Sequence, residues 1–395
     1  MSMELTLYRK LSSNLLNEVV GIKENCWIRS PLWDGFWLHS GLWLTFLMIL
    51  LDSLILQEMF YAVGVFLFWI SHRFSSFYIA WGTRAYKSLR KNQQKRFVIL
   101  PIFIVLFVFG VLFTPETVFP VTVFERILGL LLLDFAWGVH HFAAQHYGIL
   151  RLYHQRFNPE SAASAKKQDR IFCWGVGGVM VVIAELLHGT SFLQEKHFIQ
   201  FLPKIGEIDG IPLLMRFGTL LVIGVTFFMI RKAWSQDSGL PRLIYLSGVG
   251  ILVMSAFQLE PFQFLMLWTL QHWMVALGLA THMVGNDTHQ NFEKTSTKSE
   301  PNSSKHYNKT YLVLFFLCVF SAIMTPLFEI EAISFGSRYS EYLFPTLIEW
   351  LQNSEWYIFL VGIGLAGGFL HYWMDRSVYR FSDQQTRKSA QQLLI

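Results

Sequence analysis

Charged residues are scarce in this chain: Asp, Glu, Lys and Arg make up only 15% of its 395 residues, whereas hydrophobic residues make up 53%. Soluble domains carry roughly 25% charge. A chain this apolar cannot enclose all of its hydrophobic side chains in a water-soluble core, so we expect lipid to solvate many of them. The net charge of +5 is modest and lies in a few loops. That pattern indicates membrane orientation and argues against nucleic-acid binding.

Cysteine is also scarce. The chain has three cysteines, Cys26, Cys173 and Cys318, and none belongs to a C-x-x-C pair. This excludes a disulfide framework and a zinc-finger site, so we interpret the three as unpaired packing residues. Residues 1–35 lack a compact apolar run followed by a small-residue cleavage site, so we expect no cleavable signal peptide.

Long apolar stretches, in contrast, recur along the whole chain. A helix that crosses a bilayer needs about 20 apolar residues, and most of these stretches reach that length. The sequence therefore predicts an all-α, polytopic transmembrane bundle of about ten spans. The expected spans are 37–57, 59–80, 97–118, 121–150, 171–193, 211–231, 242–259, 261–284, 310–330 and 355–374.

Basic residues follow every even-numbered span. The loops at 84–96 and 151–170 are rich in Lys and Arg, and so is the tail at 376–388. Cytoplasmic loops carry such an excess, so we expect both chain termini in the cytoplasm. The expected location is a bacterial inner (cytoplasmic) membrane.

The span pattern also predicts a division of the chain. We expect an amphipathic helix over residues 5–22, because apolar residues recur there at steps of three and four. The expected parts are a cytoplasmic segment 1–36, eight spans in 37–285, a polar cytoplasmic loop 286–309, two further spans in 310–376 and a cytoplasmic tail 377–395.

Histidine stands out among the polar residues of these spans. The chain has 13 histidines, and most lie in or beside an apolar stretch. An ionisable side chain inside a membrane is costly unless it is paired, and it usually marks function. The expected topology places His72, His141, His272 and His371, from four separate spans, at similar depths of the inner leaflet.

The fourth span is the most polar of these helices. Trp137, His141 and Gln145 follow four-residue steps and therefore share one face of the helix. His140 and Tyr147 belong to a second face. In the tenth span, His371 and Asp375 are four residues apart, which suits either two ligands of one metal or an imidazole oriented by a carboxylate.

Neutral imidazoles from different helices can hold iron, copper or zinc in a fixed geometry. We therefore expect a metal ion, iron first and zinc or copper next, and a metal-dependent membrane oxidoreductase of oxygenase or desaturase type. Its expected partners are membrane lipids, a hydrophobic substrate and an electron donor. Gln145 and Tyr147 are expected to act at the catalytic site by orienting ligands or donating hydrogen bonds. The candidate ligands are His72, His140, His141, His146, His272, His371 and Asp375.

Other functions fit the same histidines. Two of them would serve as axial ligands in a haem-binding electron-transfer protein. Alternatively, they would relay protons or pass a metal ion in a transporter. In a non-catalytic scaffold, each would be satisfied alone by a neighbouring group. Glu185 and His188, near the other membrane surface, fit a structural pair as well as a second site.

Four segments resemble a family of uncharacterised bacterial polytopic membrane proteins. The segments are Ser71-His72-Arg73 with the following Tyr78, the H-F-x-x-Q-x-Y-G run over 141–148, Leu187-His188, and the H-Y-x-x-D-R run over 371–376 with Tyr379-Arg380. The resemblance implies a membrane fold and these site residues, and it implies no reaction. A looser similarity is to the bacterial carotene-cleaving dioxygenases, in which single histidines from separate helices bind one iron. This chain lacks that family's Pro-His-Gly-Ala-Leu-Asp segment.

Overall fold

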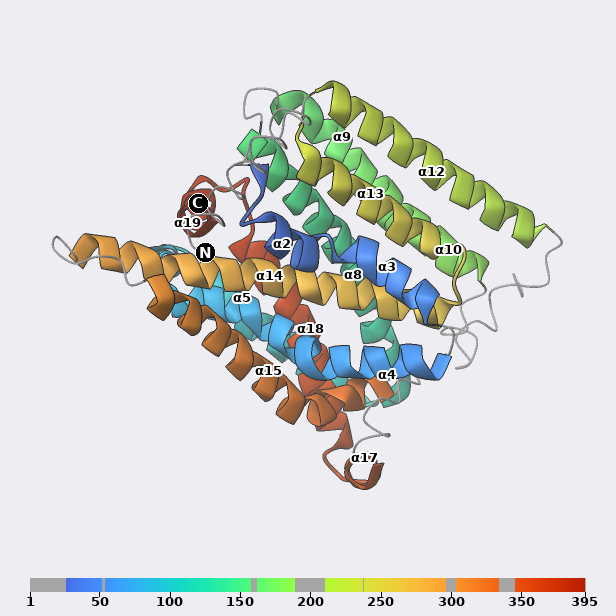
Figure 1. The fold of residues 1–395 in the computed structure, drawn as a ribbon. Coiled ribbons are helices and arrows are strands. Elements are labelled where there is room, and N and C mark those ends of the chain that lie inside the picture. Colours follow the sequence, from blue (N-terminus) through green and yellow to red (C-terminus); the bar gives the residue numbers. More distant parts are fainter. Residues whose placement is uncertain are drawn as a thin grey trace.

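The computed structural model describes seven stretches of the chain, and all of their regular structure is helical (Figure 1). The expected amphipathic helix over 5–22 lies outside them and stays a prediction. The described stretches are 26–51, 54–157, 162–188, 210–236, 238–295, 303–333 and 345–394.

Seven helices in the described residues are long and apolar enough to cross a membrane. They confirm an all-α bundle of integral-membrane type. Shorter apolar helices lie at the other three expected positions, so the count of ten spans and the cytoplasmic termini stay predictions. The seven long segments are Ile55–Gly82, Lys95–Phe113, Val123–Phe157, Ala165–Leu187, Ile211–Ser235, Gln263–Asp287 and Tyr357–Val378, and the shorter ones are Ser40–Leu50, Leu240–Ser255 and Tyr311–Thr325.

Several segments combine α-helix with short π-helical turns, which are labelled η. In Figure 1 the long helix α14 crosses the middle of the bundle, and α12 lies at one edge. The main elements are η2 (Asp34–Leu38), α3 (Ser40–Leu50), α4 (Leu54–Gly64), η3 (Val65–Trp69), α5 (Ile70–Gly82), η4 (Lys95–Ile99), α7 (Leu100–Phe113), α8 (Val123–Phe157), α9 (Ala162–Trp174), η5 (Gly175–Met180), α10 (Val181–Leu187), α12 (Ile211–Ser235), α13 (Leu240–Ser255), α14 (Pro261–Thr295), α15 (Ser303–Ile333), α17 (Pro345–Gln352), α18 (Tyr357–Val378) and α19 (Gln384–Leu394).

Burial separates a central helix from peripheral ones. In the most apolar stretch of α14, 89% of the residues are buried, whereas the figure is 22% for both η4–α7 and α12. The outward faces of the peripheral helices carry exposed Phe103, Phe217 and Phe227. A continuous apolar surface of this kind needs an apolar solvent, so α7 and α12 are suited to face lipid.

The first apolar segment is shorter than the sequence predicts. The span was expected over 37–57, but α3 ends at Leu50 and Leu51 is extended. The side-chain amide of Gln57 donates to the carbonyls of Met48 and Leu51, both at 2.9 Å. Carbonyls at the C-terminus of a helix have no hydrogen-bond partner within it. Gln57 of the next helix supplies the missing donor where α3 ends.

The last two apolar helices pack into the same bundle. α15 contacts α5, α14 and α18. The backbone amide of Ile70, directly after η3, donates to the Ser321 hydroxyl of α15 at 3.1 Å. The helices also extend into the expected loop 286–309, since α14 continues to Thr295 and α15 begins at Ser303.

A buried ion-pair cluster joins three helices. Asp169 of α9 accepts a hydrogen bond from Arg242 of α13 at 2.5 Å and lies 3.5 Å from Arg151 of α8. Asp169 and Arg242 are almost completely buried. Removing one partner would leave an uncompensated charge in the interior, so this cluster fixes the three helices relative to one another.

The C-terminal helix α19 lies against α14. The Asn286 side chain donates to the Leu393 carbonyl at 2.7 Å. Asp383 precedes α19 and accepts from the amide and hydroxyl of Thr386, at 2.8 and 2.7 Å. These two hydrogen bonds hold the pKa of the Asp383 carboxyl below its ordinary value. The expected cytoplasmic tail 377–395 thus contains a capped, docked helix.

Candidate metal centre

Four buried side chains from three helices converge in the middle of the bundle. They are His141 of α8, His272 of α14, and His371 and Asp375 of α18, and one ligand atom of each lies within 4.8 Å of the others. All four are at most 7% exposed. The group could hold a metal ion, and it consists of residues that the sequence predicts as ligands.

The carboxylate of Asp375 lies between two imidazoles. His371 and Asp375 are one helical turn apart, so they share a face of α18. His371 Nδ1 is 3.6 Å from Asp375 Oδ1, and His141 Nε2 is 3.3 Å from Asp375 Oδ2. The hydroxyl of Ser76 on α5 donates to Oδ1. A fourth helix therefore holds the carboxylate in place.

The imidazoles of this cluster carry buried nitrogens without a hydrogen-bond partner. They are His141 Nε2, His272 Nε2, and both ring nitrogens of His371. A buried polar atom without a partner costs about 1–3 kcal/mol. Several such atoms directed at one small region are unusual in a folded core, and a cation among them would satisfy them together.

Gln145 fixes the tautomer of His272. Its Oε1 accepts from His272 Nδ1 at 2.9 Å, and its Nε2 donates to the His272 carbonyl at 3.3 Å. An amide oxygen only accepts, so Nδ1 carries the proton and Nε2 keeps a lone pair. Histidines that bind metals are commonly held in this way through the second nitrogen. The expected role of Gln145 in orienting a ligand matches this contact.

His72 lies at the edge of the cluster. Its ring centroid is 4.5 Å from that of His371 and 5.1 Å from that of His272. Its Nδ1 is 3.2 Å from the Phe68 carbonyl, so Nδ1 donates and Nε2 keeps the lone pair. The structure thus brings all four histidines of the predicted set together, with His72 beside the group of four.

Aromatic side chains surround the histidines. Phe142 packs on His272 with ring centroids 4.2 Å apart, Tyr372 lies 4.9 Å from His141, and Trp273 stacks on His72 at 5.6 Å. These rings exclude water from the site. Electrostatic interactions inside such a shell are stronger than they would be in water.

Two predicted site residues lie away from the cluster. His140 is exposed, and its Nδ1 accepts from Trp174 Nε1 at 3.1 Å. Tyr147 also packs beside Trp174, with ring centroids 5.5 Å apart. Consecutive residues of an α-helix point about 100° apart, so His140 faces away when its neighbour His141 faces inward. Neither residue lies where a ligand of this centre must be.

His146 is buried but lies outside the group of four converging side chains. Its Nδ1 is 2.9 Å from the Tyr245 hydroxyl of α13. At the other end of the bundle, His188 Nε2 donates to the Ala256 carbonyl at 2.9 Å, so its hydrogen-bond partner is that carbonyl and not the neighbouring Glu185.

Ser76 is a site residue that the sequence reasoning missed. A signal for it was present, because Ser76 follows His72 by four residues and therefore shares its helix face. Phe142 and Tyr372 were likewise adjacent to predicted ligands in the sequence. Aromatic residues are so frequent in this chain that sequence alone did not single them out.

The four donors fit a first-row transition metal ion after a small contraction. Two nitrogen ligands at about 2.1 Å from one ion are at most roughly 4.2 Å apart. Atoms separated by as much as 4.8 Å must therefore move inward by a few tenths of an ångström. Three imidazoles and one carboxylate are a donor set used for iron, zinc and other divalent ions.

No protein-family profile, curated protein or solved structure matches this chain. The two resemblances noted from the sequence therefore stay predictions, and the function has to be inferred from the site.

Proposed function

We propose that this protein is a membrane metalloenzyme in which His141, His272, His371 and Asp375 bind one metal ion, iron first. We further propose an oxidoreductase of oxygenase or desaturase type that acts on a hydrophobic molecule. The observation that supports this most is the convergence of buried, unpartnered ring nitrogens on one carboxylate.

A purely structural role explains these histidines less well. Structural histidines inside a membrane bundle are each satisfied by a carbonyl or hydroxyl. Here His371 has no hydrogen-bond partner on either nitrogen, and His272 is satisfied on one nitrogen only. Bound metal would compensate the cost of burying them, which is the reason to prefer ligation.

The spacing of the rings favours a single ion over haem. Two axial imidazoles on opposite sides of a haem iron have ring centroids on the order of 6 Å apart, with the porphyrin plane between them. The histidine rings of the cluster that contact each other have centroid distances from 4.5 Å for His72 and His371 to 5.8 Å for His272 and His371. The rings also pack on one another, which suits coordination of a small ion.

The position of the site supports a hydrophobic substrate. The cluster lies among helices of membrane-spanning length, and aromatic rings line it. A redox-active ion at these ligands would supply one-electron chemistry. The chain's own residues would hold the site: Gln145 sets the tautomer of His272, Ser76 anchors Asp375, and the aromatic rings exclude water.

Elemental analysis and an optical spectrum of detergent-purified protein test the metal centre. We expect close to one iron per chain and no intense Soret band. His141→Ala should remove the metal, whereas His140→Ala, which changes the adjacent exposed residue, should keep it. A folded wild-type protein without metal after growth in metal-replete medium would refute the centre.

Oxygen uptake tests the reaction type. The reduced, iron-loaded protein should consume oxygen when an unsaturated acyl chain, an isoprenoid or a polyene is added in detergent. His272→Ala serves as the inactive control. Absence of substrate-dependent uptake across these three classes, in protein with full iron content, would refute the oxygenase assignment and leave the metal site standing.

A further inference from the structure

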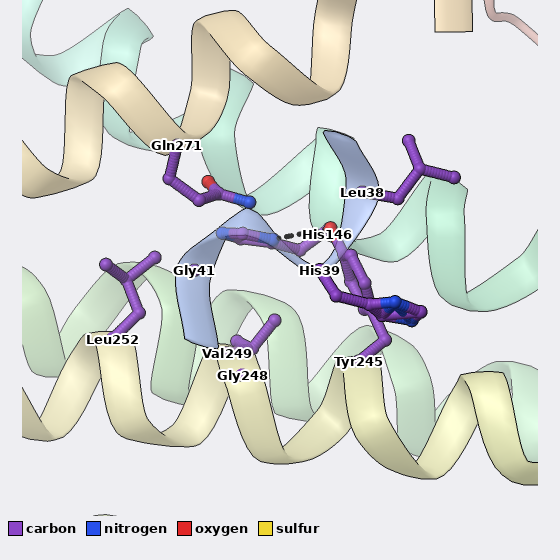
Figure 2. Close-up of a pocket in the computed structure, with 9 residues that line it drawn as sticks. All are labelled: Leu38, His39, Gly41, His146, Tyr245, Gly248, Val249, Leu252 and Gln271. Carbon is purple, nitrogen blue, oxygen red and sulfur yellow. Dashed lines mark hydrogen bonds between the residues drawn. The ribbon is translucent and has the colours of Figure 1, made fainter. Parts of the chain in front are cut away.

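A second buried polar site lies beside the metal centre. His39 and Gly41 at the start of α3, His146 of α8, Tyr245 of α13 and Gln271 of α14 surround a pocket, which we name the His146 pocket (Figure 2). The proposed function uses none of these residues.

Three polar atoms of the residues that line this pocket have no hydrogen-bond partner. They are His146 Nε2, Gln271 Oε1 and His39 Nδ1. Their side chains are almost completely buried, with exposures of 1%, 2% and 5%. Buried polar groups in folded proteins are normally satisfied by protein or by an ordered water. Of these atoms, His146 Nε2 and Gln271 Oε1 belong to side chains that lie close together in Figure 2, so one partner between them would satisfy both.

The chemistry of these atoms specifies the partner. Gln271 Oε1 can only accept a hydrogen bond. His39 Nε2 donates to the Pro241 carbonyl at 3.0 Å, so its Nδ1 can only accept as well. The occupant must therefore donate hydrogen bonds, and an anion does not fit. A metal cation fits poorly, because no carboxylate or thiolate lines the pocket.

The dimensions of the pocket match one water molecule. The space in which the centre of a water-sized sphere fits is about 10 Å³, close to the minimum for one buried water. A glycine contributes to the close approach of α3 and α14. A Cβ atom at Gly41 would lie 3.3 Å from Gln271 Cγ, which is tighter than an ordinary van der Waals contact.

In Figure 2 the His146 ring extends from the Tyr245 hydroxyl towards Gln271. We propose that the His146 pocket binds one water molecule, which donates to Gln271 Oε1 and hydrogen-bonds to His146 Nε2. His146 is then a hydrogen-bond partner of this water and not a ligand of the metal. The site needs no metal, so it stands apart from the proposed function.

The water site lies one residue away from the metal centre on each of two helices. His146 directly follows Gln145, and Gln271 directly precedes His272. Gln145 and His272 hydrogen-bond to each other on the side of the metal centre. A water between His146 and Gln271 therefore joins α8 to α14 a second time, one residue away from the contact that fixes the ligand tautomer.

A structure of the full-length protein in nanodiscs, at a resolution that reveals ordered waters, tests the proposal. We expect a density peak within hydrogen-bond distance of His146 Nε2 and Gln271 Oε1. Gln271→Met, which keeps the side-chain length and removes the acceptor, should lack the peak. An empty pocket in the wild type would overturn the proposal, and so would an anomalous signal from a metal in the pocket.

Metal content provides the second measurement. His146→Phe should fill the pocket and keep the metal-to-protein ratio of the wild type. Loss of metal in a folded His146→Phe protein would make His146 a ligand and overturn the proposal, and Gln271→Met gives an independent check if the Phe variant does not fold. If the wild type holds no metal, the proposed function fails while the density peak still decides the water site.

Discussion

Replacing Gln145 by Leu should weaken metal binding without changing any ligand. The substitution removes the acceptor of the His272 Nδ1 proton, which is 2.9 Å from Gln145 Oε1. The Nδ1–H would then be buried without a partner, and the ring would be free to rotate or to change tautomer. Both effects act against the lone pair that His272 Nε2 offers to the ion.

The size of the effect follows from two independent estimates. A buried donor left without a partner costs about 1–3 kcal/mol. Loss of a residue that orients a ligand typically lowers metal affinity by about 10- to 100-fold, which corresponds to roughly 1.4–2.7 kcal/mol. The two ranges agree, so we expect the Kd of Gln145→Leu to rise by a factor of about 10 to 100.

Competition titration with a chromophoric chelator, on purified apoprotein in detergent, measures this change. Gln145→Glu is the matched variant: it keeps the acceptor for the His272 Nδ1 proton and loses the donor to the His272 carbonyl, so its affinity should lie between those of the Leu variant and the wild type. Thermal unfolding of both apoproteins shows whether the fold is intact. A Leu variant that folds and binds the metal as tightly as the wild type would show that Gln145 does not position His272.

Two further substitutions test the fold. Gly278→Ala should lower the free energy of unfolding, measured by thermal unfolding, by about 1–3 kcal/mol, because the added Cβ would lie 2.4 Å from Trp37 Cβ. Gly129→Ala is the control, since a Cβ there has nothing within 4 Å and should not destabilise the protein. If the two substitutions lower stability equally, the close approach of α14 and η2 is contradicted. The hydrogen bonds from Thr386 lower the pKa of Asp383 in the folded protein. The stabilisation that this cap gives α19 is therefore fully present above the ordinary Asp pKa of about 3.9, and it is lost as the pH falls through the lower pKa of the folded protein. Asp383→Ala should therefore increase hydrogen exchange of the first α19 amides at neutral pH, by a capping loss of about 1 kcal/mol, and unchanged exchange would contradict this role.

The all-α membrane class could be predicted because the length of each apolar stretch can be read directly from the sequence. Helix ends were harder to predict. Nothing near Leu50 resembles a helix terminator such as Gly or Pro, and the break there depends on Gln57, whose amide satisfies the free carbonyls. A contact of this kind exists only after the helices have packed, so local sequence does not reveal it.

The candidate site could be predicted in large part from depth. Four histidines from separate helices at a similar expected depth are most easily buried against one another in the bundle interior. His141, His272 and His371 do converge there. Depth alone does not give the rotation of a helix about its axis. His140 was therefore included although it faces Trp174, and His146 was included although it faces the pocket with Tyr245.

The single carboxylate of the centre has an electrostatic consequence. A divalent ion bound beside Asp375 would leave one positive charge uncompensated, because Asp375 is the one carboxylate among the four converging side chains. Isolated charge is expensive in such surroundings. An open coordination position should therefore prefer an anion, such as hydroxide or the ionised head of a fatty acid, to a neutral molecule of the same shape.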